Sequence, residues 1–557
     1  MGQSDFFKTV LAGLVFLCGG ALVLWVLSGF GDRPSKADDG AKNQILHIGN
    51  GTEPAEIDPH ITTGVQEFHI QLAVFEGLVS EDPETLAPVP GVAESWDISE
   101  GGRVYTFHLR DAHWSDGSPV TAGDFELSFK RALQPKLANE YAQMLYVAKN
   151  AEKYFQSEVE RAKGEKGEVE WEDVGFKALD DKTFEVTLES PISYFLSLLN
   201  HHSFFPVPVK TVMKHGDFDS RNNRWTRPGN FVGNGPFVLE EWVVNHVLVV
   251  RKNPHYWDAD RVKLKKIYFY PIENLDTEER AFRAGQIHRT NKLPLPKIPQ
   301  YIREGHPDLL VAPYLGTYHY MFNTKLPALK DKRVRQALNL SIDREAITRA
   351  ITGGGEVPAF SFVPPNCAGY NSEHKLTYDV ERAKELLAEA GYPNGEGFPV
   401  YEILYNTLES HKTIAEAIQQ MWKKNLGIDV GLKNQEWKVY LSSKTQGDFE
   451  MVRFGWIGDY VDPNTFLELY TGHNGNNNSG WANPEYDALI AKAEATVDTE
   501  KRYAVFQEAE KLLLEESPIM PIYYYMSTYL LDHRIKGWYP NLLDHHPYKY
   551  VYFEEEE

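Results

Sequence analysis

Alternating apolar and polar positions mark the first large part of the chain as rich in strands. Between residues 79 and 207, VYTFHLR (104–110) and TFEVTLE (183–189) place apolar side chains at every second position. This period of two is typical of strands with one buried face. The dense charges of residues 153–173 interrupt the pattern and predict a solvated face. We therefore expect a mainly β unit with few helices here.

The strand pattern returns in residues 208–315, where EEWVVNHVLVVRKNP (240–254) predicts the longest strand. Near the end of this part, the proline-rich residues 292–308 predict a surface crossover. At the beginning of the chain, QILHIGN (44–50) predicts a strand, and FHIQLAVFEGL (68–78) has helical spacing.

Helices and strands alternate in the third part, residues 316–526. DVERAKELLAEAGYP (379–393) predicts an amphipathic helix that a glycine and a proline terminate. Residues 398–406 predict a strand, 411–427 a helix and 428–432 a second strand. Strand, helix and strand at this spacing form a βαβ unit, so we expect a parallel sheet.

The N-terminus carries an apolar run, residues 9–31, without a single charge. As a helix it would span ~34 Å, which is enough to cross a bilayer. Its length and poor cleavage site favour an uncleaved N-terminal anchor, with a cleaved secretory signal as the alternative. Either reading predicts export of the body. Residues 32–43 then predict a polar linker.

Composition narrows the class of protein. A chain of 557 residues is too long for one core, so two or three domains are expected. The net charge of −22 argues against a nucleic-acid partner, since phosphates require a basic surface. The two cysteines, Cys18 and Cys367, leave the body without an internal disulfide and exclude cysteine zinc sites.

Motifs for catalysis or cofactors are missing from the sequence. There is no phosphate-binding GxxxxGK[ST], no HExxH and no GxSxG. The histidine pairs at 201–202 and 545–546 have no evident third metal ligand. We expect no enzyme activity, no cofactor and no metal, although a glycosidase-like pair of carboxylates is not excluded among 79 acids.

The stretch RFGWIGDYVDPNTF (453–466) is unusual for a core strand because it contains one carboxylate, Asp459, among aromatic residues. Burying a lone carboxylate is costly unless a cation meets it. That cation is either an internal Lys or Arg or the amine of a ligand. Arg453 offers the opposite charge to the other end of such a ligand.

At these residues the chain resembles the oligopeptide-binding proteins, the extracytoplasmic receptors of bacterial ABC peptide importers. The resemblance runs from about Ile45 to the C-terminus and includes GVAESWDIS (91–99), NGPFVLEEWVVN (234–245) and DKRVRQALNLSIDREAI (331–347). It implies an α/β fold of the two-jaw periplasmic-binding-protein type II, with mixed sheets, flanking helices and an extra inserted domain.

The resemblance also implies segment boundaries. After an N-terminal anchor and linker (1–43), lobe I comprises residues 44–78, 208–315 and 527–557. Lobe II is the inserted domain, 79–207, and lobe III is residues 316–526. Peptide is expected in the cleft between lobes I and III.

The same resemblance implies roles for individual residues. Asp459, in GWIGDY, matches the acid that binds the peptide amine. Arg453 and His411 match bases that meet the carboxylate of shorter and of slightly longer peptides, and Lys444 stands where the family can carry an Arg. The implied peptide-binding set is Val65, Tyr141, His411, Trp437, Lys444, Arg453, Gly455, Trp456 and Asp459.

One position departs from the family pattern. Some members carry an acid just before the Gly-Val of the first cleft loop, but here Thr63 stands there, with Glu67 only near in sequence. A preference for Lys-containing peptides is therefore not expected from this loop.

The function implied is capture of peptides of about three to five residues by a monomer and their delivery to ABC permease subunits. A receptor of this kind pairs with the peptide backbone as an added strand. Murein peptides, nickel or oligosaccharides on the same fold, and peptide sensing, remain alternatives; nickel and sugar would not need the poles Asp459 and Arg453.

Overall fold

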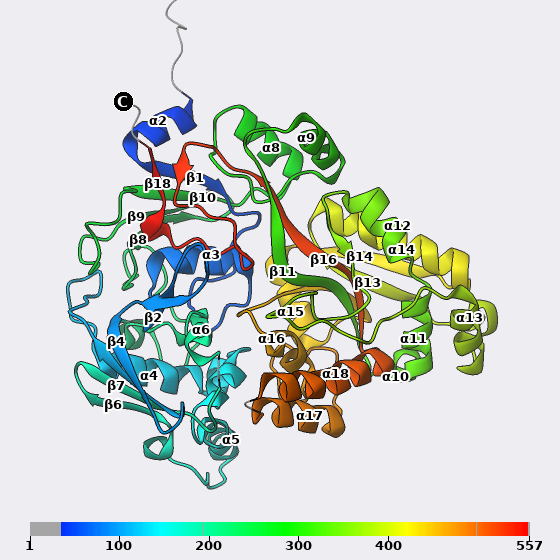
Figure 1. Ribbon diagram of the computed structural model, residues 1–557, viewed down its shortest axis with the longest axis horizontal. Coiled ribbons are helices and arrows are strands. Elements are labelled where there is room, and N and C mark those ends of the chain that lie inside the picture. The colour runs from blue at the N-terminus through cyan, green and yellow to red at the C-terminus, as the bar shows by residue number, and fades with distance from the viewer. Residues whose placement is uncertain (1–34, 193, 497, 555–557) are drawn as a thin grey trace, which may run out of the picture.

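A computed structural model describes residues 35–192, 194–496 and 498–554, which form three bodies around three larger sheets (Figure 1). The residues 9–31, for which the sequence predicts an anchor or signal, lie outside these ranges. Within them, no helix has both the length and the apolar character required to cross a membrane.

Lobe I is built on a four-stranded sheet from two distant parts of the chain. Its order is β1 (Ile45–Gly49), β10 (Lys266–Tyr270), β9 (Val247–Lys252) and β8 (Phe237–Val243). β1 is parallel to β10, and the other neighbours are antiparallel. The helices of this lobe are α2 (Lys36–Asn43), α3 (Val65–Val74), α7 (Val209–His215), α8 (Leu275–Arg283) and α9 (Ile298–Glu304).

Lobe II contains an antiparallel sheet with the order β4 (Ala93–Ser99), β5 (Val104–Leu109), β7 (Thr183–Thr187) and β6 (Phe176–Asp180). A short hairpin, β2 (Val79–Glu81) and β3 (Pro88–Pro90), precedes it. The alternation read from residues 104–110 and 183–189 is confirmed, since Phe107 and Phe184 are fully buried. The helices are α4 (Ala122–Ala132), α5 (Ala151–Ala162) and α6 (Phe195–Leu198).

Lobe III carries a mixed six-stranded sheet. Its order is β12 (Val357–Pro358), β16 (Ile519–Leu530), β11 (Leu309–Phe322), β15 (Met451–Ile457), β13 (Tyr401–Asn406) and β14 (Val430–Gln435). The expected βαβ unit is confirmed, because β13 and β14 are parallel and α14 (Glu409–Leu426) joins them. The helix ends at Gly427, which adopts a positive φ.

The other helices of this lobe surround the sheet and its lower end (Figure 1). They are α10 (Pro327–Lys330), α11 (Lys332–Leu340), α12 (Arg344–Ile347), α13 (Val380–Glu389), α15 (Trp437–Gln446), α16 (Asn464–Leu467), α17 (Pro484–Glu494) and α18 (Thr499–Glu516). A last hairpin in lobe I pairs β17 (Ile535–Lys536) with β18 (Tyr552–Phe553).

Two long neighbouring strands, β11 and β16, run from lobe I into lobe III (Figure 1). Their register breaks between Pro313 and Thr317. At the lobe I end, Leu530 is fixed by hydrogen bonds with Thr290. A break in an otherwise continuous pair of strands is a natural point for bending between two bodies. The segment boundaries stay a prediction, and both strands extend across them.

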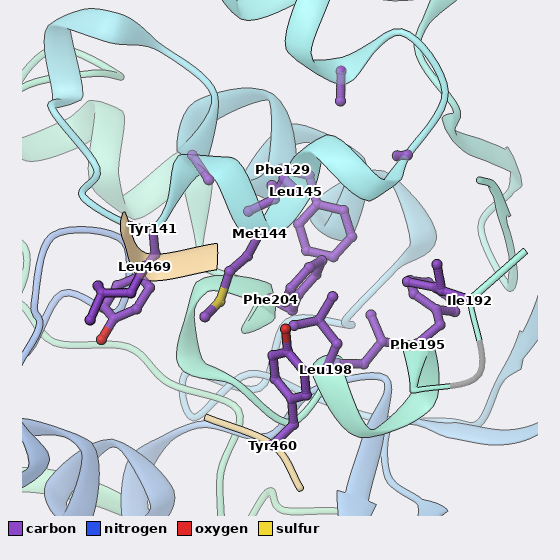
Figure 2. Close-up of a cluster of buried hydrophobic side chains, with 14 of the residues drawn as sticks. Phe129, Tyr141, Met144, Leu145, Ile192, Phe195, Leu198, Phe204, Tyr460 and Leu469 are labelled. Atoms are coloured by element: carbon purple, nitrogen blue, oxygen red, sulfur yellow. The ribbon is translucent and has the colours of Figure 1, made fainter. Parts of the chain in front are cut away.

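Lobes II and III meet through a buried apolar cluster (Figure 2). Tyr460, from the segment after β15, points toward Leu198 and Met144 of lobe II in this view. Its ring also stacks on Tyr194, with ring centroids 4.8 Å apart. The residue next to Asp459 is thus anchored between two lobes, which limits where the Asp459 carboxylate lies.

Two local expectations were wrong. Residues 36–43 form helix α2 and not a linker, because Ser35 and Asp38 make a reciprocal capping box and Ala37 is buried. The run 240–254 is a hairpin, since Asn245 adopts a positive φ that turns the chain between β8 and β9. The solvated face predicted for the charged run 153–173 is confirmed, since its charged side chains are exposed or half-buried, while Tyr154 lies in the buried stripe of α5.

Candidate functional site

A cavity of about 240 Å3 lies where lobes I, II and III meet. Its lining includes all nine residues that the sequence analysis proposed for peptide binding. They come from α3, the segment before Ala142, α14, α15, β15 and the turn that follows β15. Positions almost 400 residues apart in the sequence therefore converge on one space.

Asp459 is an acid without a cationic partner. Its side chain is only 11% exposed, and its carboxylate accepts a long hydrogen bond from Thr465 Oγ1 at 3.4 Å. Within the described ranges, no Lys or Arg nitrogen comes within 4.0 Å of it. Burial raises the pKa of Asp459 well above its ordinary value, and the Thr465 hydroxyl opposes this only in part. A ligand cation at this place would stabilise the carboxylate.

His201, from lobe II, lies beside Asp459, with Nε2 3.5 Å from Oδ1. Burial, followed by the neighbouring His202 and His545, lowers the pKa of His201 well below its ordinary value. A neutral imidazole does not compensate a carboxylate, so this contact leaves the need for a cation in place.

Arg453, near the start of β15, is a buried cation held by neutral groups. Its Nη2 donates to the Tyr525 hydroxyl at 2.7 Å, and its guanidinium lies 4.7 Å from the centre of the Tyr318 ring. Nε has no partner, and no carboxylate among the described residues lies within 4.0 Å. The charge is oriented but not neutralised, which suits a carboxylate ligand.

His411 and Lys444 differ from the simple expectation of charged bases. His411 is 4% exposed, and burial, together with the charges of Arg453 and Lys292, lowers its pKa well below the ordinary value. Without a ligand it is neutral, and a ligand carboxylate would have to supply the charge that favours protonation. Lys444 is also buried, and its Nζ lies 3.9 Å from Glu140 of lobe II.

Lys292 is a cavity residue that sequence reasoning missed, because it begins the proline-rich run read as a surface crossover. It lines the cavity, and burial, reinforced by Arg453, lowers its pKa to about 8. Its backbone N–H and that of Asn291 donate to the carboxylate of Glu278 at 3.4 and 2.9 Å. No local sequence pattern predicts that Lys292 lines the cavity, because its position depends on contacts with helix α8 of lobe I.

The aromatic residues form walls that join lobes. Trp437 Nε1, from α15, donates to Glu67 Oε1 of α3 at 3.2 Å. The Tyr141 ring lies 4.4 Å from that of His201 and 6.1 Å from that of Trp456. Glu67 therefore supports a wall, and Thr63 lines the cavity where some family members carry an acid.

Strand β15 has an open edge at the cavity. β13 pairs with it only at Met451 and Val452, whereas β11 pairs with it along its whole length. Among the described residues, no strand lies beside Arg453–Ile457 on the β13 side. Backbone groups along such an edge can pair with an added extended segment. Asp459 and Arg453 flank this edge.

Comparisons with known proteins agree with this geometry. Residues 87–478 match the model of "Bacterial extracellular solute-binding proteins, family 5 Middle". The chain is 38% identical over 509 residues to the periplasmic oligopeptide-binding protein OppA of Salmonella typhimurium, covering 89% of this chain and 90% of that protein.

Two solved structures are also similar to this chain over most of its length. The structure of the Escherichia coli murein tripeptide binding protein MppA has a TM-score of 0.86 at 37% identity, covering 92% of this chain and 99% of that one. Haemophilus influenzae OppA in complex with RPPGFSPFR has a TM-score of 0.84 at 35% identity, covering 92% and 99%. This chain belongs to family 5 of the bacterial extracellular solute-binding proteins.

Proposed function

We propose that this protein captures short peptides between lobes I and III and delivers them to the permease of an ABC importer. The observation that carries the proposal is the open edge of β15 between two uncompensated charges of opposite sign. A free peptide presents an ammonium group, an extended backbone and a carboxylate in the same order. Asp459 would meet the ammonium group and Arg453 the carboxylate.

The lining suits peptides of differing sequence. Backbone pairing supplies affinity that does not depend on side chains, while walls such as Trp437, Trp456 and Tyr141 provide apolar contact. We infer a preferred length of about three to five residues, with His411 and Lys444 as carboxylate partners that act for other lengths. Without a ligand, His411 is neutral and Lys444 lies near Glu140. A ligand carboxylate would therefore have to favour protonation of His411 or compete with Glu140 for Lys444.

Calorimetry with tri-, tetra- and penta-alanine tests this proposal, with a nickel salt and an oligosaccharide as controls. We expect heat from at least one alanine peptide and none from the controls. Binding of nickel or sugar, with no response to any peptide, would overturn the proposal.

Murein peptides are the second candidate, because the similar MppA structure is that of a murein tripeptide binding protein. A murein tripeptide added to the same series distinguishes the two. Affinity for it far above that for tri-alanine would assign the protein to murein peptides rather than to general peptide uptake.

We expect the protein to act outside the cytoplasm, because similar proteins are named as periplasmic. We further propose that residues 9–31 tether the protein to the inner membrane and that the body is a monomer. Full-length protein expressed in a bacterium should sediment with membranes and retain its N-terminus. Soluble protein that begins near Asp32 would instead indicate a cleaved signal.

A further inference from the structure

Two basic residues of the cavity have no ion-pair partner among the described residues. Of the basic residues around it, Arg289 is paired with Asp544 at 3.2 Å and Lys444 approaches Glu140 at 3.9 Å. Arg453 and Lys292 have no carboxylate within 4.0 Å in the part of the chain that the structure describes. One C-terminal carboxylate would compensate only one of these two cations.

Both cations are adjacent to the same side chain, Tyr525 of β16. Arg453 Nη2 donates a hydrogen bond to the Tyr525 hydroxyl oxygen at 2.7 Å, and Lys292 Nζ lies 5.5 Å from the centre of the Tyr525 ring. Arg453 belongs to lobe III, whereas Lys292 belongs to the lobe I segment. The arrangement of the lobes in this structure thus creates a site with two positive groups.

Lys292 is held in place by its own lobe. The Glu278 carboxylate accepts hydrogen bonds from Asn291 and Lys292, and the next side chain, Leu293, is buried. The preceding Thr290 is bonded to Leu530 of β16. The backbone of Lys292 is thus fixed at the cavity wall, and its side chain lines the cavity.

We propose that Lys292 makes this cavity select peptides that carry a second carboxylate at or beside their C-terminal residue. A C-terminal Glu or Asp provides two carboxylates, one for Arg453 and one for Lys292. With a neutral C-terminal residue, the ligand covers Lys292 without pairing with it, and only Glu356 and Asp544, both more than 4.0 Å away, attract its charge, which weakens binding. This inference rests on the proposed function, since it names a class of peptide for the same site.

Calorimetry on the full chain with matched peptides tests the proposal. Ala-Ala-Glu is compared with Ala-Ala-Gln, and Ala-Ala-Ala-Glu with Ala-Ala-Ala-Gln, because each pair differs in one charge at constant shape. We expect the Glu peptide to bind roughly 10- to 100-fold more tightly in at least one pair. Glu-Ala-Ala and Gln-Ala-Ala control for net charge, and these two should bind with similar affinity.

Variants assign the selectivity to Lys292. Lys292→Met should reduce the Glu-over-Gln ratio to about twofold or less, and Lys292→Arg should keep most of it. Lys412→Met is the matched control, since Lys412 is exposed and does not line the cavity; its ratio should equal that of the native protein. Thermal unfolding verifies that each variant is folded.

The outcomes separate this inference from the function on which it rests. If tri-alanine and every other peptide fail to bind, the proposed function is wrong. If peptides bind but Glu and Gln are treated alike, or if Lys292→Met keeps the native ratio, the selectivity assigned to Lys292 is wrong. If neither Lys292 variant folds, the Glu-over-Gln affinity ratio of the native protein alone decides whether the proposal holds.

Discussion

Burial shifts the pKa of individual side chains in this cavity. Burial raises the pKa of Asp459, and its surroundings offer only a hydroxyl and a neutral imidazole to oppose this, since no Lys or Arg within the described ranges comes within 4.0 Å. A buried acid of this kind is either partly protonated or meets a cation from outside the chain. Both possibilities lead to measurable consequences.

The first prediction is that Asp459→Asn weakens peptide binding by ~2–5 kcal/mol, because the ligand ammonium group then loses its charged partner. This corresponds to roughly 30- to several-thousand-fold in affinity. An N-acetylated peptide should lose a similar amount with the native protein.

The two losses should not add, since both remove one interaction. Calorimetry with native and variant protein, each against free and acetylated peptide, measures this coupling. If Asp459→Asn instead lowers the melting temperature and leaves the affinity of the folded molecules intact, Asp459 has a structural role.

The second prediction concerns pH. The pKa of Asp459 is raised in the ligand-free protein, and a bound ammonium group would lower it, so peptide binding should release a proton below the raised pKa. Affinity should therefore fall as the pH decreases through that value.

Calorimetry at pH 6 in two buffers that differ in ionisation enthalpy reports the number of protons released. We expect net release with the native protein and a smaller release, or none, with Asp459→Asn. Equal proton counts for the two proteins would contradict the prediction.

At the scale of elements, β15 joins the two charged ends of the site to an open backbone edge. Gly455 lies in the middle of this edge and pairs with Tyr318 of β11. A Cβ added there would overlap the Tyr525 hydroxyl oxygen and lie 3.1 Å from Arg453 Nη2. The absence of a side chain thus keeps both the edge and the Arg453–Tyr525 hydrogen bond intact.

The third prediction is that Gly455→Ala reduces affinity for tri-alanine by about tenfold or more, because Tyr525 and Arg453 must move. Overpacking should also cost ~1–3 kcal/mol in the free energy of unfolding. Titration calorimetry and thermal unfolding measure the two effects.

Gly123→Ala is the matched control, since a Cβ at this position in α4 meets only the Thr121 hydroxyl oxygen at 3.6 Å. It should leave affinity unchanged. A Gly455→Ala protein that binds as tightly as the Gly123→Ala protein would show that the open edge is not part of the binding site.

At the scale of the whole molecule, the relative position of the lobes completes the site. The MppA structure matches this chain with a TM-score of 0.86, whereas the unliganded open form of MppA matches with 0.61. The lobes of this chain are therefore arranged less like that open form. Contacts that cross the cleft, such as Trp437 with Glu67, belong to the arrangement described here.

The fourth prediction is that peptide shifts the population of molecules toward a closed arrangement, because a ligand that bridges both lobes makes more contacts there. Small-angle scattering should show a smaller radius of gyration at saturating tri-alanine than without peptide. A scattering profile that stays the same at saturation, in a sample whose binding calorimetry confirms, would argue for a rigid receptor.

Local periodicity alone determined much of the architecture. The helix within residues 379–393, the βαβ unit of residues 398–432 and the strands around Phe107 and Phe184 follow from which positions are apolar, because burial of one face is a local property of each element. The local pattern gave wrong predictions where a single residue determines the backbone conformation. Asn245 turns the chain between β8 and β9, and Ser35 caps the start of α2.

Through its family motifs, the sequence also predicted Asp459 and Arg453 as the two charged ends of the proposed site. Only the tertiary structure decided which charges remain uncompensated, because partners come from distant segments: Glu140 approaches Lys444, while Arg453 has only neutral partners. Burial made His411 neutral, and the packing of lobe I against β16 brought Lys292 into the cavity. Charge and position at this site are therefore properties of the assembled lobes, since desolvation and pairing depend on what surrounds a group in space and not on its neighbours in the sequence.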